Sequence, residues 1–309
     1  MSDPRPRLGF IGVGAMGLPM ARNLLNAGYP LAFCTSRPAT AGALAAVDGV
    51  QLADPVAVAG MCDVLLVCLP ADAEIEAVLL AEGGALDVLR EGGTIIELST
   101  VSPAIVRRLG EQAAARGIAV LDAPVSGGTS GAEAATLAIM VGGAAADLAA
   151  CRPILETLGK HIYHVGPIGM GKIFKLCNQY LAAANTALVG EALTLGAAAG
   201  ADLPLLAEVI AASSGASRAL GGAVPNLLTN ELTPVGFRLD LMRKDLGLAL
   251  ALGAETRAPL ATGAVAYQLY NAASASGMGD RNFSELGKLL AQLAGVSLAQ
   301  GGRGDKEAG

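Results

Sequence analysis

The chain has 309 residues, of which 53% are hydrophobic and 16% charged, with no tryptophan and a formal net charge of −6. This length predicts two domains or one large domain, with ample apolar material for a core. The acidic balance argues against a nucleic-acid partner, because binding to phosphates favours a basic surface. Residues 258–279 are uncharged but rich in polar side chains, and residues 1–7 lack an apolar core, so we expect neither a membrane span nor an export signal.

The first motif is a G-x-G-x-x-G turn between an apolar run and an amphipathic helix pattern. Gly12 is expected to make the tight turn, Gly14 to let the backbone approach a pyrophosphate, and Gly17 to let the helix pack on the strand. An ordinary glycine-rich turn is the alternative, but the strand before and the helix after favour a dinucleotide site. The residues expected to bind the dinucleotide are Gly12, Val13, Gly14, Ala15, Met16 and Gly17.

Strand-like and helix-like stretches alternate through the first half of the chain, which predicts an α/β Rossmann-like domain with a doubly wound parallel sheet. We expect helices to begin near residues 18, 40, 55, 73, 103 and 145. The expected strands are 7–11, 31–34, 64–69, 94–97, 119–122, 137–141 and 162–164.

From about residue 169 no further strand is expected, and Ala- and Leu-rich helical patterns cover 171–199, 203–213, 241–255, 259–275 and 284–293. We therefore predict an all-α C-terminal domain for substrate binding and oligomerisation. The predicted division is a dinucleotide-binding domain at 1–167, the helical domain at 168–300, and a flexible polar tail at 301–309.

The end of the second predicted strand bears on the choice of dinucleotide. An NAD site favours an acidic residue about 20 positions beyond the glycines, where it binds the ribose hydroxyls. Here Thr35, Ser36 and Arg37 follow the strand, and the next acid is Asp48. Because these three side chains can hold a 2′-phosphate, the sequence favours NADP(H), with NAD(H) as the alternative.

Other strand ends also carry candidates, because ligands of doubly wound sheets gather at the carboxyl ends of the strands. Cys68, Leu69 and Pro70 close one predicted strand, and Ser99, Thr100 and Ser102 follow another. Capping of the helix that begins at Pro103 is an equally good interpretation of these hydroxyls. In the segment 122–128, Ser126, Gly127 and Gly128 offer a hydroxyl and bare N–H groups that can cradle a carboxylate, or form a simple turn.

Lys175 lies near the start of the long predicted helix, and Asn178 and Gln179 follow it on the same helical face. A lysine in a low-dielectric pocket can act as an acid or a base. The alternative is a snorkelling lysine, which is how we interpret Lys172.

The five cysteines include no C-x-x-C pair, which predicts reduced thiols and a cytoplasmic location. No metal site is expected, because the only histidines, His161 and His164, fit a strand better than a ligand pair.

Together these motifs resemble the β-hydroxyacid dehydrogenase family, through segments 9–17, 122–128, 171–178 and 244–246. The resemblance implies a Rossmann-like domain joined to an all-helical domain, with the active site between them. It implies that Lys175 is the catalytic acid/base. It further implies that the substrate carboxylate is held by Ser126, Gly127 and Gly128, with Asn178 and Gln179 nearby. Cofactor contacts are likewise implied for Leu69, Pro70, Thr100 and Lys244, which match positions that contact the cofactor in the family. Without the resemblance, Lys244-Asp245 would be interpreted as an exposed charged pair.

The implied function is transfer of a hydride between NAD(P) and a small 3-hydroxy acid, or its semialdehyde or 2-oxo acid. Many family members have Asn-Asn where this chain has Asn178-Gln179, so the size of the pocket is expected to differ. One alternative is an imine reductase, although relatives of that kind have Asp or Tyr in place of Lys175. Another is a non-catalytic NADPH-binding module.

The partners expected are a small carboxylate-bearing substrate and further copies of the chain. A homodimer or homotetramer is expected because the alanine-rich helices have more apolar surface than one bundle can bury.

Overall fold

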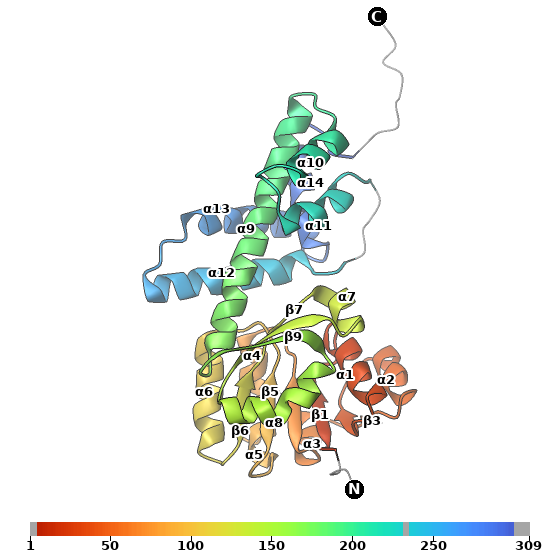
Figure 1. Ribbon diagram of the computed structural model, residues 1–309, viewed down its shortest axis with the longest axis vertical. Coiled ribbons are helices and arrows are strands. Elements are labelled where there is room, and N and C mark those ends of the chain that lie inside the picture. The colour runs from red at the N-terminus through yellow and green to blue at the C-terminus, as the bar shows by residue number, and fades with distance from the viewer. Residues whose placement is uncertain (1–4, 231–234, 300–309) are drawn as a thin grey trace, which may run out of the picture. The chain divides into compact units, whose positions relative to one another are not determined.

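The computed structural model describes residues 5–230 and 235–299 (Figure 1). The tail predicted at 301–309 and the first four residues of the N-terminal segment lie outside this part. The chain divides into two compact units, Met1–Leu176 and Cys177–Gly309. The division falls inside helix α9, Met170–Ala198.

The first unit is built on a sheet with the strand order β3-β2-β1-β4-β5-β6-β8-β7, and β9 pairs with β8. The pairings from β3 to β6 are parallel, as expected for a doubly wound fold, whereas β8 runs antiparallel to β6 and β7. The strands are β1 Leu8–Ile11, β2 Leu31–Phe33, β3 Val50–Gln51, β4 Val64–Val67, β5 Thr94–Glu97, β6 Ala119–Asp122, β7 Val125–Ser126, β8 Leu137–Gly142 and β9 Gly159–Gly166.

All seven predicted strands are confirmed, with ends within three residues of those expected. The sequence does not predict β3 or β7, because two residues are too few to show a period of two. Each is defined by its pairing with a neighbouring strand: Val50 of β3 pairs with Ala32 of β2, and Ser126 of β7 pairs with Ala138 of β8.

Helices cover both faces of this sheet. They are α1 Gly17–Asn26, α2 Pro38–Ala45, α3 Pro55–Gly60, α4 Asp72–Ile75 continued by η1 Glu76–Leu80, α5 Ala85–Val88, α6 Pro103–Ala114, α7 Gly128–Glu133 and α8 Ala145–Glu156. Leu66 packs in the core beside α1 and α8, while its neighbours Leu65 and Val67 pack in the core beside α3 and α6. This alternation explains why the strands are continuous apolar runs, as in sheets buried on both faces.

The second unit is all helical in its described residues, as predicted. Beyond α9 its helices are α10 Leu203–Ala211, α11 Arg218–Leu227, α12 Leu239–Thr256, α13 Ala261–Ala273 continued by η2 Ser274–Met278, η3 Phe283–Glu285 and α14 Leu286–Leu293. The sequence does not predict α11, because it contains two adjacent glycines and Pro225. Packing of Leu220 and Leu227 in the core stabilises this helix despite its low helix propensity.

Among the described residues, α9 alone has the length and composition of a membrane span. Its most apolar stretch of 18 residues has a mean hydropathy of 1.3, and 39% of that stretch is buried within the protein. Core helices of globular proteins meet the same criterion. Two polar side chains of α9 are buried with protein partners: Lys172 pairs with Glu97, and Gln179 donates to Asp245. We therefore interpret α9 as a core helix.

Candidate active site

The glycine turn after β1 has the shape expected of a dinucleotide site. Gly12 has a φ of +93°, and a Cβ there would collide with the backbone carbonyl of Cys68, which follows β4. A Cβ on Gly17 would collide with the carbonyl of Gly12, whereas a Cβ on Gly14 would meet no protein atom within 4 Å. Helix α1 begins at Gly17 with no side-chain cap and no acidic residue in its first turn. Free N–H groups and open space at Gly14 fit a pyrophosphate.

The segment after β2 contains the residues predicted to select the dinucleotide. Thr35 accepts a hydrogen bond through Oγ1 from the Arg37 amide at 3.2 Å, and its carbonyl accepts one from Gln51 at 3.1 Å. The side chains of Ser36 and Arg37 are exposed, and Arg37 occupies the N-cap position of α2. These bonds hold the backbone while leaving a cation and a hydroxyl at the surface.

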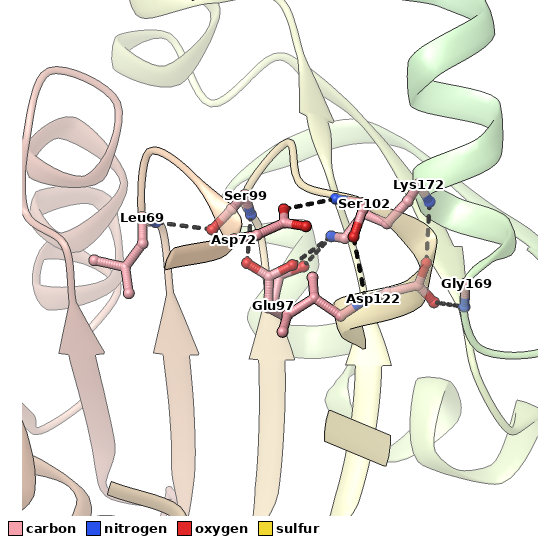
Figure 2. Close-up of polar contacts among 9 residues, drawn as sticks. Leu69, Asp72, Glu97, Ser99, Ser102, Asp122, Gly169 and Lys172 are labelled. Atoms are coloured by element: carbon pink, nitrogen blue, oxygen red, sulfur yellow. Dashed lines mark hydrogen bonds and ion pairs between the residues drawn. The ribbon is translucent and has the colours of Figure 1, made fainter. Parts of the chain in front are cut away.

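Hydrogen bonds join the segments that follow β4 and β5 (Figure 2). The Leu69 amide donates to Ser99 Oγ at 2.8 Å, and the Ser99 amide donates to Glu97 Oε1 at 2.9 Å. Ser102 Oγ caps α6 by accepting from the Ile105 amide at 3.2 Å, so the capping interpretation is confirmed for this residue. Thr100 lies half-buried between these two serines.

Three charged side chains are buried where β5, β6 and α9 meet (Figure 2). Lys172 Nζ lies 2.6 Å from Glu97 Oε2 and donates to the Glu97 carbonyl at 2.9 Å; both side chains are 0% exposed. The carboxylate of Asp122 accepts from the Gly169 amide at 3.1 Å and from the Lys172 amide at 3.0 Å. The prediction that Lys172 snorkels is therefore wrong, because a buried carboxylate pairs with its ammonium.

Burial raises the pKa of the Asp122 carboxyl. The ammonium of Lys172 and the backbone N–H groups of Gly169 and Lys172 act in the opposite direction, because they favour the ionised carboxylate. These N–H groups belong to the start of α9, where helix donors have no partner within the helix.

The Ser126–Gly128 segment connects β7 to α7. Ser126 is half-buried and pairs with Ala138 of β8, while Gly127 and Gly128 have φ values of +143° and +66°. Helix α7 begins at Gly128 without a side-chain cap. A hydroxyl is thus followed by two glycines with positive φ at the uncapped start of a helix, a combination that suits a carboxylate.

Lys175 lies on α9 one turn beyond Lys172, and its residue is 6% exposed. In the second unit, Asn178 Nδ2 donates to Gln179 Oε1 at 3.0 Å, and Gln179 Nε2 donates to Asp245 Oδ2 at 2.7 Å. Lys244 Nζ lies 3.0 Å from Asp245 Oδ1.

The interpretation of Lys244-Asp245 as an exposed pair is wrong, because the Asp245 side chain is only 1% exposed. A carboxylate can only accept, so Asp245 sets the direction of the Gln179 amide. Sequence reasoning assigns no role to Glu97, Asp122 or Asp245. For Glu97 a signal exists, since an acid that ends the apolar strand 94–97 requires a buried partner.

The histidines lie on β9 as predicted, and His164 Nε2 is 2.9 Å from the Gly143 carbonyl. Within the described residues, no group of three or more His, Cys, Asp or Glu side chains is placed to hold a metal ion.

Comparisons with known proteins cover nearly the whole chain. Residues 7–166 match the family described as the NAD binding domain of 6-phosphogluconate dehydrogenase. Residues 169–290 match the family described as NAD-binding of NADP-dependent 3-hydroxyisobutyrate dehydrogenase.

The chain is 39% identical to 2-(hydroxymethyl)glutarate dehydrogenase of Eubacterium barkeri, over 96% of this chain and 98% of that protein. It is also 39% identical to NAD-dependent L-serine dehydrogenase of Pseudomonas aeruginosa, over 92% and 97%. Among solved structures, 3-hydroxyisobutyrate dehydrogenase of Mycobacterium tuberculosis with L-serine has a TM-score of 0.83 and 32% identity, over 93% and 99%. An imine reductase from Myxococcus stipitatus has a TM-score of 0.64 at 22% identity, which shows a shared fold alone.

Substitution of Gly14 tests whether the open space in the glycine turn is used by a dinucleotide. We expect Gly14→Val to fold with a melting temperature near that of the wild type, because the added side chain meets no protein atom within 4 Å of its Cβ. Its dissociation constant for NADPH should rise at least about tenfold, because a side chain would block the approach to the pyrophosphate. Thermal melting and fluorescence titration measure the two effects. Gly60→Val, also in open space but on α3, is the control, and unchanged NADPH binding by Gly14→Val would contradict the assignment.

Proposed function

The chain belongs to the β-hydroxyacid dehydrogenase family and is an NAD(P)-dependent dehydrogenase of small hydroxy acids, and from this premise we propose that Lys175 is its general acid and base. The observation that carries the proposal is the burial of this amine one turn beyond the anchored start of α9. The neighbouring ammonium of Lys172 is excluded from this role, because its Nζ lies against two oxygens of Glu97 and is shielded from solvent.

When bound, the nicotinamide supplies the hydride in reduction and accepts it in oxidation. In reduction the protonated Lys175 amine donates a proton to the substrate oxygen as negative charge develops there. In oxidation the neutral amine removes the hydroxyl proton. The proton thus moves between Nζ and the oxygen on the reacting carbon, and exchange with solvent restores the starting protonation state of the amine before the next turnover.

Binding of the substrate carboxylate is assigned to Ser126, Gly127 and Gly128, with Asn178 and Gln179 as further contacts. The hydroxyl of Ser126 and the uncapped start of α7 that follows it support this role. A fixed carboxylate orients the reacting carbon toward the amine. Because Gln179 is tied to Asp245 at 2.7 Å, its extra methylene is held in a defined position, where it changes the size of the pocket.

The substrate class proposed is a 3-hydroxy acid with a terminal alcohol, or the corresponding semialdehyde. The compounds named for the relatives, 2-(hydroxymethyl)glutarate, L-serine and 3-hydroxyisobutyrate, share the skeleton HOCH2–CHR–COO− and differ in R. The carboxylate and the alcohol are therefore the recognised groups, while R is the group that Gln179 and its surroundings select.

Cofactor contacts are assigned to the glycine turn Gly12–Gly17 and to Leu69, Pro70, Thr100 and Lys244. NADP(H) is the proposed cofactor, since the exposed guanidinium of Arg37 and the hydroxyls of Thr35 and Ser36 suit a 2′-phosphate. We place the enzyme in the cytoplasm, where its cysteines stay reduced.

We expect Lys175→Ala to bind NADPH as the wild type does and to lose about 100- to 10,000-fold in kcat, because a positioned acid–base group contributes that factor. Absorbance of the reduced nicotinamide measures turnover on a panel of short 3-hydroxy acids, semialdehydes and glyoxylate. Lys160→Ala, an exposed lysine on β9, is the control and should keep full activity. Near wild-type turnover by Lys175→Ala would refute its role.

The same panel separates the rival functions. An imine reductase would turn over cyclic imines and leave aldehyde acids untouched. A non-catalytic module would bind NADPH tightly and turn over none of the acids.

For Arg37→Ala we expect the preference for NADPH over NADH, as a ratio of kcat/KM values, to fall about 10- to 100-fold, since a hydrogen bond to a charged group contributes about 1.5–3 kcal/mol. Initial rates with both cofactors measure the ratio. Arg152→Ala on α8 removes an exposed arginine elsewhere in the first unit and should leave it unchanged. A wild-type enzyme that clearly prefers NADH would contradict the NADP(H) assignment.

Homodimer or homotetramer formation through the helical unit is proposed from a stripe of leucines on α9. Leu181, Leu188 and Leu195 are 58%, 51% and 72% exposed and recur every seven residues, which places them along one face of the helix. Size-exclusion chromatography with light scattering should give a dimer or tetramer for the wild type and a smaller species for Leu188→Glu. Gln112→Glu on α6 controls for the added charge. A wild-type monomer at micromolar concentration would end this proposal.

A further inference from the structure

A network of buried charges lies beside the residues assigned to catalysis but has no role in the chemistry described so far. Its members are Glu97 at the end of β5, Asp122 at the end of β6 and Lys172 in the first turn of α9. The Glu97–Lys172 pair is completely shielded from solvent, with 2.6 Å between its charged atoms.

Ion pairs of this kind are a poor source of stability, because removal of two charges from water cancels most of their attraction. An apolar pair of similar volume would fill the same space at less cost. The ion pair instead fixes the orientation of the first turn of α9. The Lys172 ammonium must lie against two oxygens of Glu97, one from the side chain and one from the backbone.

Asp122 holds the same turn from another side. Its two carboxylate oxygens accept from the amides of Gly169 and Lys172, so it caps α9 from a strand that is 47 residues distant in sequence. The carboxylate fits only because its neighbours are glycines: a Cβ on Gly142 or Gly171 would collide with Asp122. The first turn of α9 is thus held by four polar contacts with β5 and β6.

The network continues toward the segments assigned to the cofactor. Glu97 Oε1, the oxygen not paired with Lys172, accepts from the Ser99 amide, and Ser99 Oγ accepts from the Leu69 amide. One chain of buried and partly buried bonds therefore joins the segments after β4 and β5 to the helix that carries Lys175 (Figure 2).

We infer that Glu97, Asp122 and Lys172 are positioning residues of the dehydrogenase reaction, which hold Lys175 in register with the strand ends assigned to the cofactor. The inference rests on the proposed function of Lys175. A displacement of about 1 Å in a reacting group can cost about 100-fold in rate, so a fixed first turn matters for the amine one turn later.

The test compares the single variant Lys172→Met with the double variant Glu97→Gln/Lys172→Met. The single variant leaves a buried, unpaired carboxylate, and its melting temperature should fall strongly. The double variant is neutral and similar in volume, so its melting temperature should recover. We expect its kcat to remain about 10- to 100-fold below the wild type, with KM for the hydroxy acid and the dissociation constant for NADPH within about threefold.

Recovery of both the melting temperature and kcat in the double variant would show a merely structural role and overturn the inference. The matched control, Arg152→Met/Glu156→Gln, neutralises an exposed pair on α8 and should leave kcat unchanged. Lys175→Ala is measured in parallel. If it loses turnover while the double variant does not, the positioning inference alone fails; if it keeps turnover, the proposed function fails and the inference fails with it.

Asp122→Asn provides a second route should the double variant not fold. The amide keeps one oxygen for a backbone N–H but presents an NH2 group to the other, which loosens the first turn of α9. We expect kcat to fall at least about tenfold while NADPH binding is retained. An unchanged kcat in a folded Asp122→Asn protein would overturn the inference.

Discussion

The proposed position of Lys175 depends on how the N-terminal turn of α9 is attached to the sheet. Helix donors at that end have no partner within the helix, and here the carboxylate of Asp122 accepts from the amides of Gly169 and Lys172. The side chain of Lys172 then reaches back to Glu97. Because a buried charge without a partner is costly, this arrangement has few alternatives, and it fixes the direction of the first turns of α9, up to Lys175.

The glycines of the turn after β1 and the glycines around Asp122 serve different purposes. Around Asp122, glycines make room for a carboxylate that the protein itself supplies. At Gly14 a missing side chain leaves space that no protein atom occupies, while Gly12 and Gly17 have their backbones pressed against neighbouring carbonyls. The glycines around Asp122, together with Gly12 and Gly17, allow close packing within the first unit. Gly14 instead leaves open space where a phosphate group fits.

Much of the fold could be predicted from the sequence. Strands covered on both faces are continuous apolar runs, and helices such as α3 and α6 begin with proline after a capping side chain. The short strand β7 and the glycine-rich helix α11 could not be predicted, because pairing and core packing, which act between distant residues, stabilise them.

The candidate site divides in the same way. Local motifs indicate the dinucleotide turn, the Ser126–Gly128 segment and Lys175 as candidates, because the residues of each motif are neighbours in sequence. The sequence favours a snorkelling lysine at Lys172, because its partner Glu97 lies 75 residues away; the acid at the end of strand 94–97 indicates a buried partner but does not identify it. The burial of Asp245 could not be predicted either, since its hydrogen-bond donor Gln179 is 66 residues distant in the sequence.

A crystal structure of the enzyme with bound NADP+ and a 3-hydroxy acid would test the central claim most directly. We predict that Lys175 Nζ lies within about 3.2 Å of the substrate hydroxyl oxygen, the range for direct proton transfer, and that Lys172 remains paired with Glu97. A complex in which the Lys175 amine points away from that hydroxyl, or in which Lys172 has left Glu97 to contact it, would contradict the proposed division of roles between the two lysines.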